Sequence, residues 1–207
     1  WPWPRRLPRA PHSDKVAATD IQQGTGQMFI LILGVALWWA AHLLKRIAPG
    51  LRQRIGRGGV AGLLVVSVVL MVIGYRMSDG PYWWGASAPL KVINNLLVLL
   101  AVYLYAADGM ETRITHYLRH PQLTGFALWA FAHLLPNGDL PSFILFGGLG
   151  VWALVQMAVI NRAVPEWTPP SDQVPVRNEL MAAAGAVVVV LVVGLIHAWL
   201  GYNPFGG

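Results

Sequence analysis

Apolar residues run in long stretches along this chain, and short polar segments separate them. A helix needs about 20 apolar residues to cross the hydrocarbon core of a bilayer, with some latitude for tilt. Backbone groups cannot stay unpaired in lipid, so runs of this kind form helices. Six runs approach the required length: residues 28–44, 60–75, 92–107, 123–135, 143–160 and 180–200. The pattern predicts an all-α fold, a polytopic transmembrane bundle of about six helices.

The fourth run is the shortest and contains Gly125 and His133. A segment this short either crosses with the help of its neighbours or enters and leaves the membrane on the same side. The bundle has five spans if the fourth segment is re-entrant.

Residues 1–27 differ from the rest of the chain, because they are rich in proline and polar side chains. Such a composition does not support a packed core, and it lacks the apolar stretch of a signal peptide. Met28 leads directly into the first apolar run. We therefore expect residues 1–27 to be a disordered tail or the product of a mis-assigned start, and residues 28–207 to form the membrane domain.

Composition supports the membrane assignment and removes several kinds of chemistry. Hydrophobic residues make up 56% of the chain and charged residues only 12%, with a mean hydropathy of +0.52. These values do not suit an ordinary soluble domain. The chain has no cysteine, which excludes disulfides, thiolate metal sites and a cysteine nucleophile.

The net charge of +6 comes from basic residues between the apolar runs, not from one basic stripe, so we expect no nucleic-acid partner. Alternate connections carry nine of them: Lys45, Arg46, Arg52, Arg54, Arg57, Arg113, Arg119, Arg162 and Arg177. The opposite connections carry only Arg76 and Lys91. Four more lie in residues 1–27, which leaves nine against six. Basic loops stay in the cytoplasm, so this bias predicts a multi-pass protein of the bacterial inner (plasma) membrane with its C-terminus outside the cytoplasm.

Five histidines lie in or near the predicted spans: His42, His116, His120, His133 and His197. An ionisable side chain inside a membrane is costly, so it marks a candidate site unless it serves structure by bonding to a neighbouring helix. Neutral imidazole binds haem iron and other transition metals, and without cysteine, ligation by two histidines is the most natural cofactor hypothesis. Trp38, Trp39, Phe126, Trp129 and Phe131 are aromatic neighbours that would line either a porphyrin cavity or the lipid.

The most informative segment is RHPQLTGFALWAFAHLLPNGD, residues 119–139. Pro121 favours the first turn of a helix, and Gly125 permits close approach of a neighbouring helix. Asp139 follows a turn and is predicted to act as a cap. Arg119 would interact with a lipid phosphate or with a haem propionate.

This segment resembles the NnrU family, together with a first span that ends in WWAAHLLKRIAPGLR and a last span that ends in HAWLGYNP. The resemblance covers essentially residues 28–207. The family includes bacterial proteins linked to nitrite and nitric oxide metabolism, and it is related to the plant 15-cis-zeta-carotene isomerase.

The resemblance implies haem b as cofactor, with His42 and His133 as axial ligands and His120 as the histidine of the RHP motif. The isomerase has a cysteine three residues before the second ligand, and this chain has Ala130 there. Carotenoid isomerase activity is therefore not to be assumed. Helix rise raises a further difficulty, since it places His42 and His133 at depths that differ by on the order of 10 Å. Depth alone pairs His42 with His120, and His133 with His197.

Three functions follow as expectations. The first is a haem-binding membrane protein linked to nitrite or nitric oxide metabolism, or to redox chemistry on a lipophilic substrate, possessing an isomerase or redox activity if it is an enzyme. The second is a non-catalytic accessory or assembly protein that contacts nitric oxide or nitrite reductase components. The third is a membrane methyltransferase of the isoprenylcysteine type, suggested by RHPQLTG, although the later segment INRAVPEWTPP offers only Glu166 of the paired acids that such enzymes have.

Overall fold

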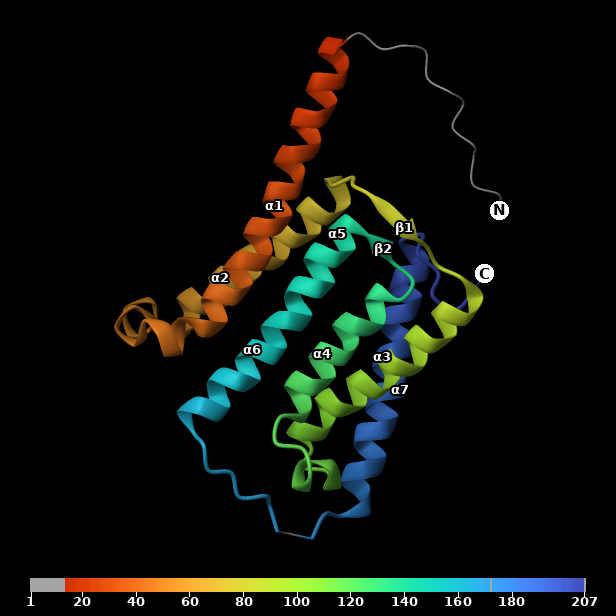
Figure 1. Cartoon of the computed structure of the whole chain (residues 1–207). Coiled ribbons are helices and arrows are strands. Elements are labelled where there is room, and N and C mark those ends of the chain that lie inside the picture. The colour runs from red at the N-terminus through yellow and green to blue at the C-terminus, as the bar shows by residue number, and fades with distance from the viewer. Residues whose placement is uncertain (1–13, 172, 207) are drawn as a thin grey trace.

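The computed structural model describes residues 14–171 and 173–206, with side chains from residue 26 onward. The described chain is a bundle of long helices with one small pair of strands (Figure 1). Its elements are α1 (Asp14–Ile47), α2 (Pro49–Met77), β1 (Tyr82–Trp84), α3 (Ala88–Gly109), η1 (Arg113–His116), α4 (Pro121–Leu134), β2 (Gly138–Asp139), α5 (Leu140–Ser142), η2 (Phe143–Gly147), α6 (Gly148–Ala163) and α7 (Val176–Trp199).

Five segments are long and apolar enough to span a membrane: Gly26–Ile47, Pro49–Met77, Ala88–Gly109, Leu140–Ala163 and Val176–Trp199. The Leu140–Ala163 segment comprises α5, η2 and α6, which follow one another without a break. These segments confirm the predicted all-α transmembrane bundle. Each contains one of the predicted apolar runs, apart from a single residue at the C-terminal end of the last run.

The fourth predicted span corresponds to α4, which has 14 residues and is roughly 21 Å long. Its two ends lie at opposite ends of the bundle, so α4 runs along its neighbours and does not turn back between them (Figure 1). Within Pro121–Leu134 only Gln122 and Phe131 are exposed. Since neighbouring helices cover the rest of α4, it does not need the full length that a lipid-facing helix requires.

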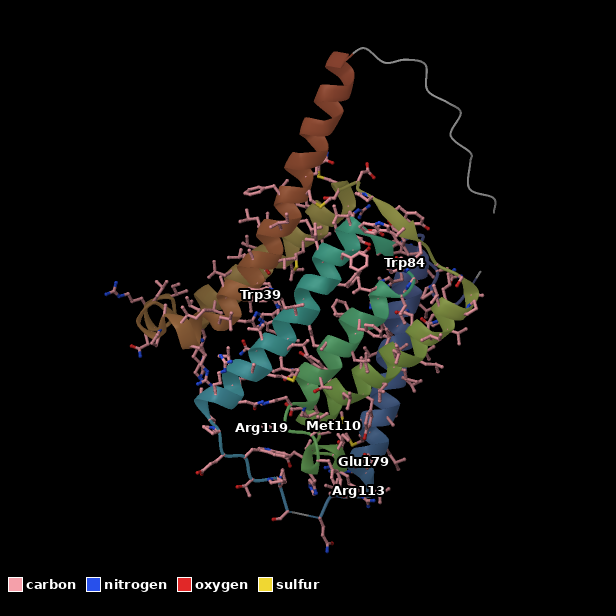
Figure 2. The ribbon with its side chains drawn as sticks, viewed as in Figure 1. Trp39, Trp84, Met110, Arg113, Arg119 and Glu179 are labelled. Atoms are coloured by element: carbon pink, nitrogen blue, oxygen red, sulfur yellow. The ribbon has the colours of Figure 1, made fainter. Side chains whose placement is uncertain are left out.

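The two ends of the bundle are held together differently. At one end, β1 pairs with β2 in antiparallel fashion, and the Trp84 indole donates to the Leu135 carbonyl at 2.9 Å. At the other, called the basic end here because it carries the connections rich in Lys and Arg, the Arg119 side chain bonds to the Val164 carbonyl and Glu179 accepts from the Arg113 backbone N–H at 2.7 Å. Figure 2 shows Arg119, Arg113 and Glu179 at this end and Trp84 at the other.

Several boundaries differ from those predicted. Helix α1 begins at Asp14, so residues 14–27 extend the first span as helix. Helix α2 begins at Pro49 and bends at Gly56, whose φ of 70° lies in the left-handed region that favours glycine. The basic connection after the first span is therefore mostly helical. Residues 1–13 of the predicted tail lie outside the described residues.

Candidate functional site

His42 lies in the penultimate turn of α1, toward the basic end. Its Nδ1 donates to the Trp38 carbonyl of the same helix at 2.9 Å. A carbonyl only accepts, so Nδ1 carries the proton and the Nε2 of the neutral ring keeps its lone pair. The ring lies 4.3 Å from the Trp38 ring and 4.5 Å from the Trp152 ring, measured between centroids. The lone pair of Nε2 is free to accept a hydrogen bond or bind a metal.

His133 repeats this arrangement near the other end, in the last turn of α4. Its Nδ1 donates to the Trp129 carbonyl at 2.9 Å, which again leaves Nε2 with its lone pair. The imidazole is stacked on Phe146 at 4.8 Å and lies 4.8 Å from Trp129. Asn137 Nδ2 donates to the His133 carbonyl at 2.8 Å and so closes the end of the helix.

A continuous chain of aromatic rings joins the two histidines, and it is called the aromatic chain below. Its five rings come from α1, α4, η2 and α6: Trp38, Phe126, Trp129, Phe146 and Trp152. Phe126 stands at its centre, 5.2 Å from Trp152 and 5.3 Å from Trp129. The rings fill the interior between the histidines.

The structure does not bring His42 and His133 onto one iron. Trp38 and Phe126 are stacked at 5.9 Å and mark a common level of the antiparallel helices α1 and α4. His42 lies one turn beyond this level toward the basic end, and His133 lies seven residues beyond it toward the strands, so helix rise separates them by roughly 15 Å along the bundle. Imidazole nitrogen binds metals at about 2 Å, so two axial ligands lie about 4 Å apart.

The other residues predicted to bind the cofactor are His120 and Arg119, and their hydrogen bonds connect α4 with α6. His120 precedes the first turn of α4, and its Nε2 is 2.8 Å from Asn161 Oδ1. Arg119 donates to the Pro165 carbonyl at 3.4 Å and to that of Val164. Both residues therefore join the start of α4 to the end of α6, at the basic end of the bundle.

His116 and His197 lie outside the aromatic chain. His116 ends η1 and is half-buried, whereas His197 is exposed on α7 and its Nδ1 donates to the Val193 carbonyl at 2.8 Å. Within the described part of the chain, no group of three or more His, Asp or Glu residues is arranged to hold a metal ion.

The aromatic candidates divide into two sets. Trp38, Phe126 and Trp129 belong to the aromatic chain, as their positions beside the histidines suggested. Trp39 instead donates through Nε1 to the Gly148 carbonyl at 3.0 Å, and Phe131 is 55% exposed. Ala130 is fully buried, and its Cβ faces Gly150 of α6.

Trp152 and Gln156 were not among the residues singled out from the sequence; the fold places Trp152 beside His42, and Gln156 follows one turn later on α6. Trp152 is only 4% exposed, and its indole is the second one beside His42, after that of Trp38. The sequence does contain a pattern that relates them: Trp152 and Gln156 are four positions apart and so share one face of a helix. The deepest polar residue of an apolar run is a candidate for the interior, and Gln156 fits that description.

Asp139 is the N-terminal cap that the sequence predicted. Its Oδ1 accepts from the Ser142 backbone N–H at 2.8 Å, at the start of the continuous helical segment Leu140–Ala163. The first N–H groups of a helix have no partner within the helix, so this contact satisfies one of them.

Replacing Asp139 by alanine is expected to lower the free energy of unfolding by about 1 kcal/mol, because the Ser142 N–H loses its acceptor. Unfolding of the purified protein with increasing SDS in mild detergent measures the change. Asp79→Ala is the matched control, since Asp79 is exposed in the connection between α2 and β1. Equal stability of the two variants would show that the cap contributes nothing.

Comparison with known proteins gives one family. The family model described as NnrU protein matches residues 30–204 of the chain, which includes His42, His133 and every helix from α2 to α7. No curated protein and no solved structure matches the chain.

Proposed function

Because the chain belongs to the NnrU family, we propose that it is a membrane protein of nitrite and nitric oxide metabolism that binds haem b through one axial imidazole, that of His133. The observation that carries this proposal is the orientation of the His133 ring, whose Nδ1 donates to the Trp129 carbonyl at 2.9 Å. A backbone acceptor on the second ring nitrogen is the usual way in which a ligating histidine is oriented.

The surroundings of His133 suit a porphyrin better than those of His42. The Phe146 ring is stacked on His133 and the Trp129 ring lies beside it, whereas two indole rings whose buried N–H groups have no partner among the described residues, those of Trp38 and Trp152, lie beside His42. When bound by one imidazole, haem iron keeps a coordination position open for a small ligand such as nitric oxide. His133 supplies the ligand atom, and Trp129 and Phe146 fix the orientation of its ring.

Placement in the membrane follows from the distribution of charge. We propose that the basic end faces the cytoplasm, because connections rich in Lys and Arg are retained there. His133 then lies in the outer half of the bundle and His42 in the cytoplasmic half. The partners consistent with this placement are the lipid bilayer and components of nitric oxide or nitrite reductases.

The absorption spectrum of the purified protein, oxidised and dithionite-reduced, tests the haem proposal. We expect the wild-type protein, expressed with adequate haem, to show the high-spin Soret band of a haem with one axial imidazole. His133→Ala should lose most of this haem, and His42→Ala should retain it. A low-spin spectrum that both substitutions abolish would instead support a pair of ligands, and haem retained in His133→Ala would overturn the assignment.

The second candidate function is that of an accessory protein for nitric oxide respiration that does not itself bind haem stably. The filled interior favours it, because the aromatic chain packs between His42 and His133 and each imidazole bonds to its own helix. Co-purification with a reductase, without turnover by the isolated protein, is the expected result. Crosslinking in native membranes that captures no reductase subunit would count against it.

A further inference from the structure

Three buried polar atoms of α1 and α6 have no hydrogen-bond partner among the described residues. They are Trp38 Nε1, Trp152 Nε1 and Gln156 Oε1. An indole N–H or an amide oxygen buried without a partner is costly, so such groups normally bond to protein or to ordered water. Two of these groups belong to indole rings that lie beside His42, which identifies a polar site inside an otherwise apolar bundle.

These groups lie at about the same level along α1 and α6. The Trp152 ring lies 5.4 Å from the Trp38 ring, and both rings contact His42. Gln156 follows Trp152 by one turn, so it lies on the same face of α6 and nearer the basic end. The site therefore spans about one helical turn between α1 and α6.

This site has two hydrogen-bond donors and two acceptors. Trp38 and Trp152 each offer one N–H donor, while His42 Nε2 and Gln156 Oε1 are acceptors. A water molecule accepts two hydrogen bonds and donates two, and buried waters usually bind two to four polar partners. Water thus satisfies both kinds of group, which an anion or a cation alone does not.

Polar side chains continue from this site to the basic end, along the interface of the antiparallel helices α4 and α6. Thr124 Oγ1 lies 3.8 Å from Met157 Sδ, a weak acceptor. Nearer the basic end, His120 Nε2 lies 2.8 Å from Asn161 Oδ1, and Asn161 is exposed. On the other side, toward His133, Phe126 and Trp129 offer only apolar ring atoms and an indole edge.

We propose that water enters the interface of α1, α4 and α6 from the basic end and reaches His42, where Trp38, Trp152 and Gln156 bind it. The aromatic chain stops this hydrated path at Phe126. His42 then exchanges protons with the aqueous phase at the basic end through this water, and His133 does not. This inference is independent of the haem proposal, since it concerns the other histidine and the other half of the bundle.

Single cysteines test this path cleanly, because the protein has none of its own. A methanethiosulfonate reagent reacts with thiolate, which forms readily only where water reaches the thiol. We expect a membrane-impermeant reagent to modify Gln156→Cys when it is applied at the basic end, but not from the opposite side. Leu154→Cys is the matched control on α6, since Leu154 is 56% exposed on the outer face of the bundle and would face lipid.

The expected rate for Gln156→Cys exceeds that for Leu154→Cys by about tenfold or more. Asn161→Cys, at the exposed end of the path, reports that the reagent reaches the basic end. Thr124→Cys probes the same path from α4 and is expected to react in the same way, should Gln156→Cys fold poorly. Modification of both path variants as slowly as Leu154→Cys, or from the opposite side only, would overturn the proposal.

Discussion

Replacing Gly125 by leucine is expected to lower the free energy of unfolding by about 3 kcal/mol, the upper end of the usual cost of overpacking. A Cβ at this position would lie 2.5 Å from the Ala101 carbonyl oxygen and 3.1 Å from both Leu104 Cβ and Tyr105 N. Two of these neighbours are backbone atoms of α3, so a change of rotamer cannot relieve the clash. Helix α4 has to move away from α3 as a whole.

Unfolding with SDS in mild detergent measures this loss, and far-ultraviolet circular dichroism reports whether the helices survive. Gly185→Leu in α7 is the control, because a Cβ there meets no atom within 4 Å. If both leucine variants are as stable as the wild-type protein, close packing of α4 on α3 does not stabilise the bundle.

Replacing Gly74 by leucine should have an effect of similar size, about 3 kcal/mol, at the crossing of α1 and α2. A Cβ on Gly74 would lie 2.4 Å from the Leu31 backbone nitrogen and 2.6 Å from its Cα. Gly34 makes the reciprocal approach, since its Cβ would lie 2.7 Å from the Met71 nitrogen. Leu31 and Met71 belong to the best-buried apolar cluster of the bundle, so separating the helices also opens this cluster.

The matched control lies on the same helix. A Cβ on Gly62 meets no atom within 4 Å, so Gly62→Leu tests the effect of adding leucine to α2 without the clash. The same SDS titration should place Gly62→Leu near the wild-type protein and Gly74→Leu well below it. Equal losses in the two variants would mean that the glycine contact is not what holds α1 against α2.

Both predictions rest on the same physical property of membrane helices. Lipid tails are as apolar as leucine, so burying apolar side chains between helices gives little driving force, and close van der Waals contact between backbones becomes more important. Gly125, Gly34 and Gly74 provide such contact. Helix α4, which carries His133, is held in place by one of these contacts.

The family resemblance implies that His42 and His133 bind the same haem. In this fold, however, the two histidines have separate environments. His133 is enclosed by rings, and polar groups without partners surround His42. The haem spectra of His133→Ala and His42→Ala and the cysteine accessibility of residue 156 therefore give independent results. Failure of the haem proposal would leave the hydrated path standing, and the reverse also holds.

Local rules explain why some features of the site were predictable. Asp139 follows a turn and precedes a helix, which is where a capping carboxylate belongs, and it caps Ser142. Pro121 occupies the first turn of α4, where its missing N–H costs nothing. Gly125 lies in a run of larger side chains, and another helix approaches it closely. Each inference needed only the residue and its immediate neighbours in the sequence.

Other features depend on pairs of residues far apart in the chain. Tyr82–Trp84 forms a strand that is paired with Gly138–Asp139. Hydropathy cannot indicate such a pairing, because both segments lie between spans. The short run of α4 gave no sign that it would be enclosed by its neighbours and therefore able to cross the bundle with 14 residues.

By itself, the sequence determined that this chain is a helical membrane bundle, because a bilayer leaves long apolar runs no other way to pair their backbone groups. It also determined the family and the histidines worth testing. Which side chains meet depends on the tertiary structure, which separates His42 from His133 and places Trp152 beside His42. The relative depth and rotation of two helices are set by contacts such as that of Gly125 with Ala101, and a pattern along one chain segment does not contain them.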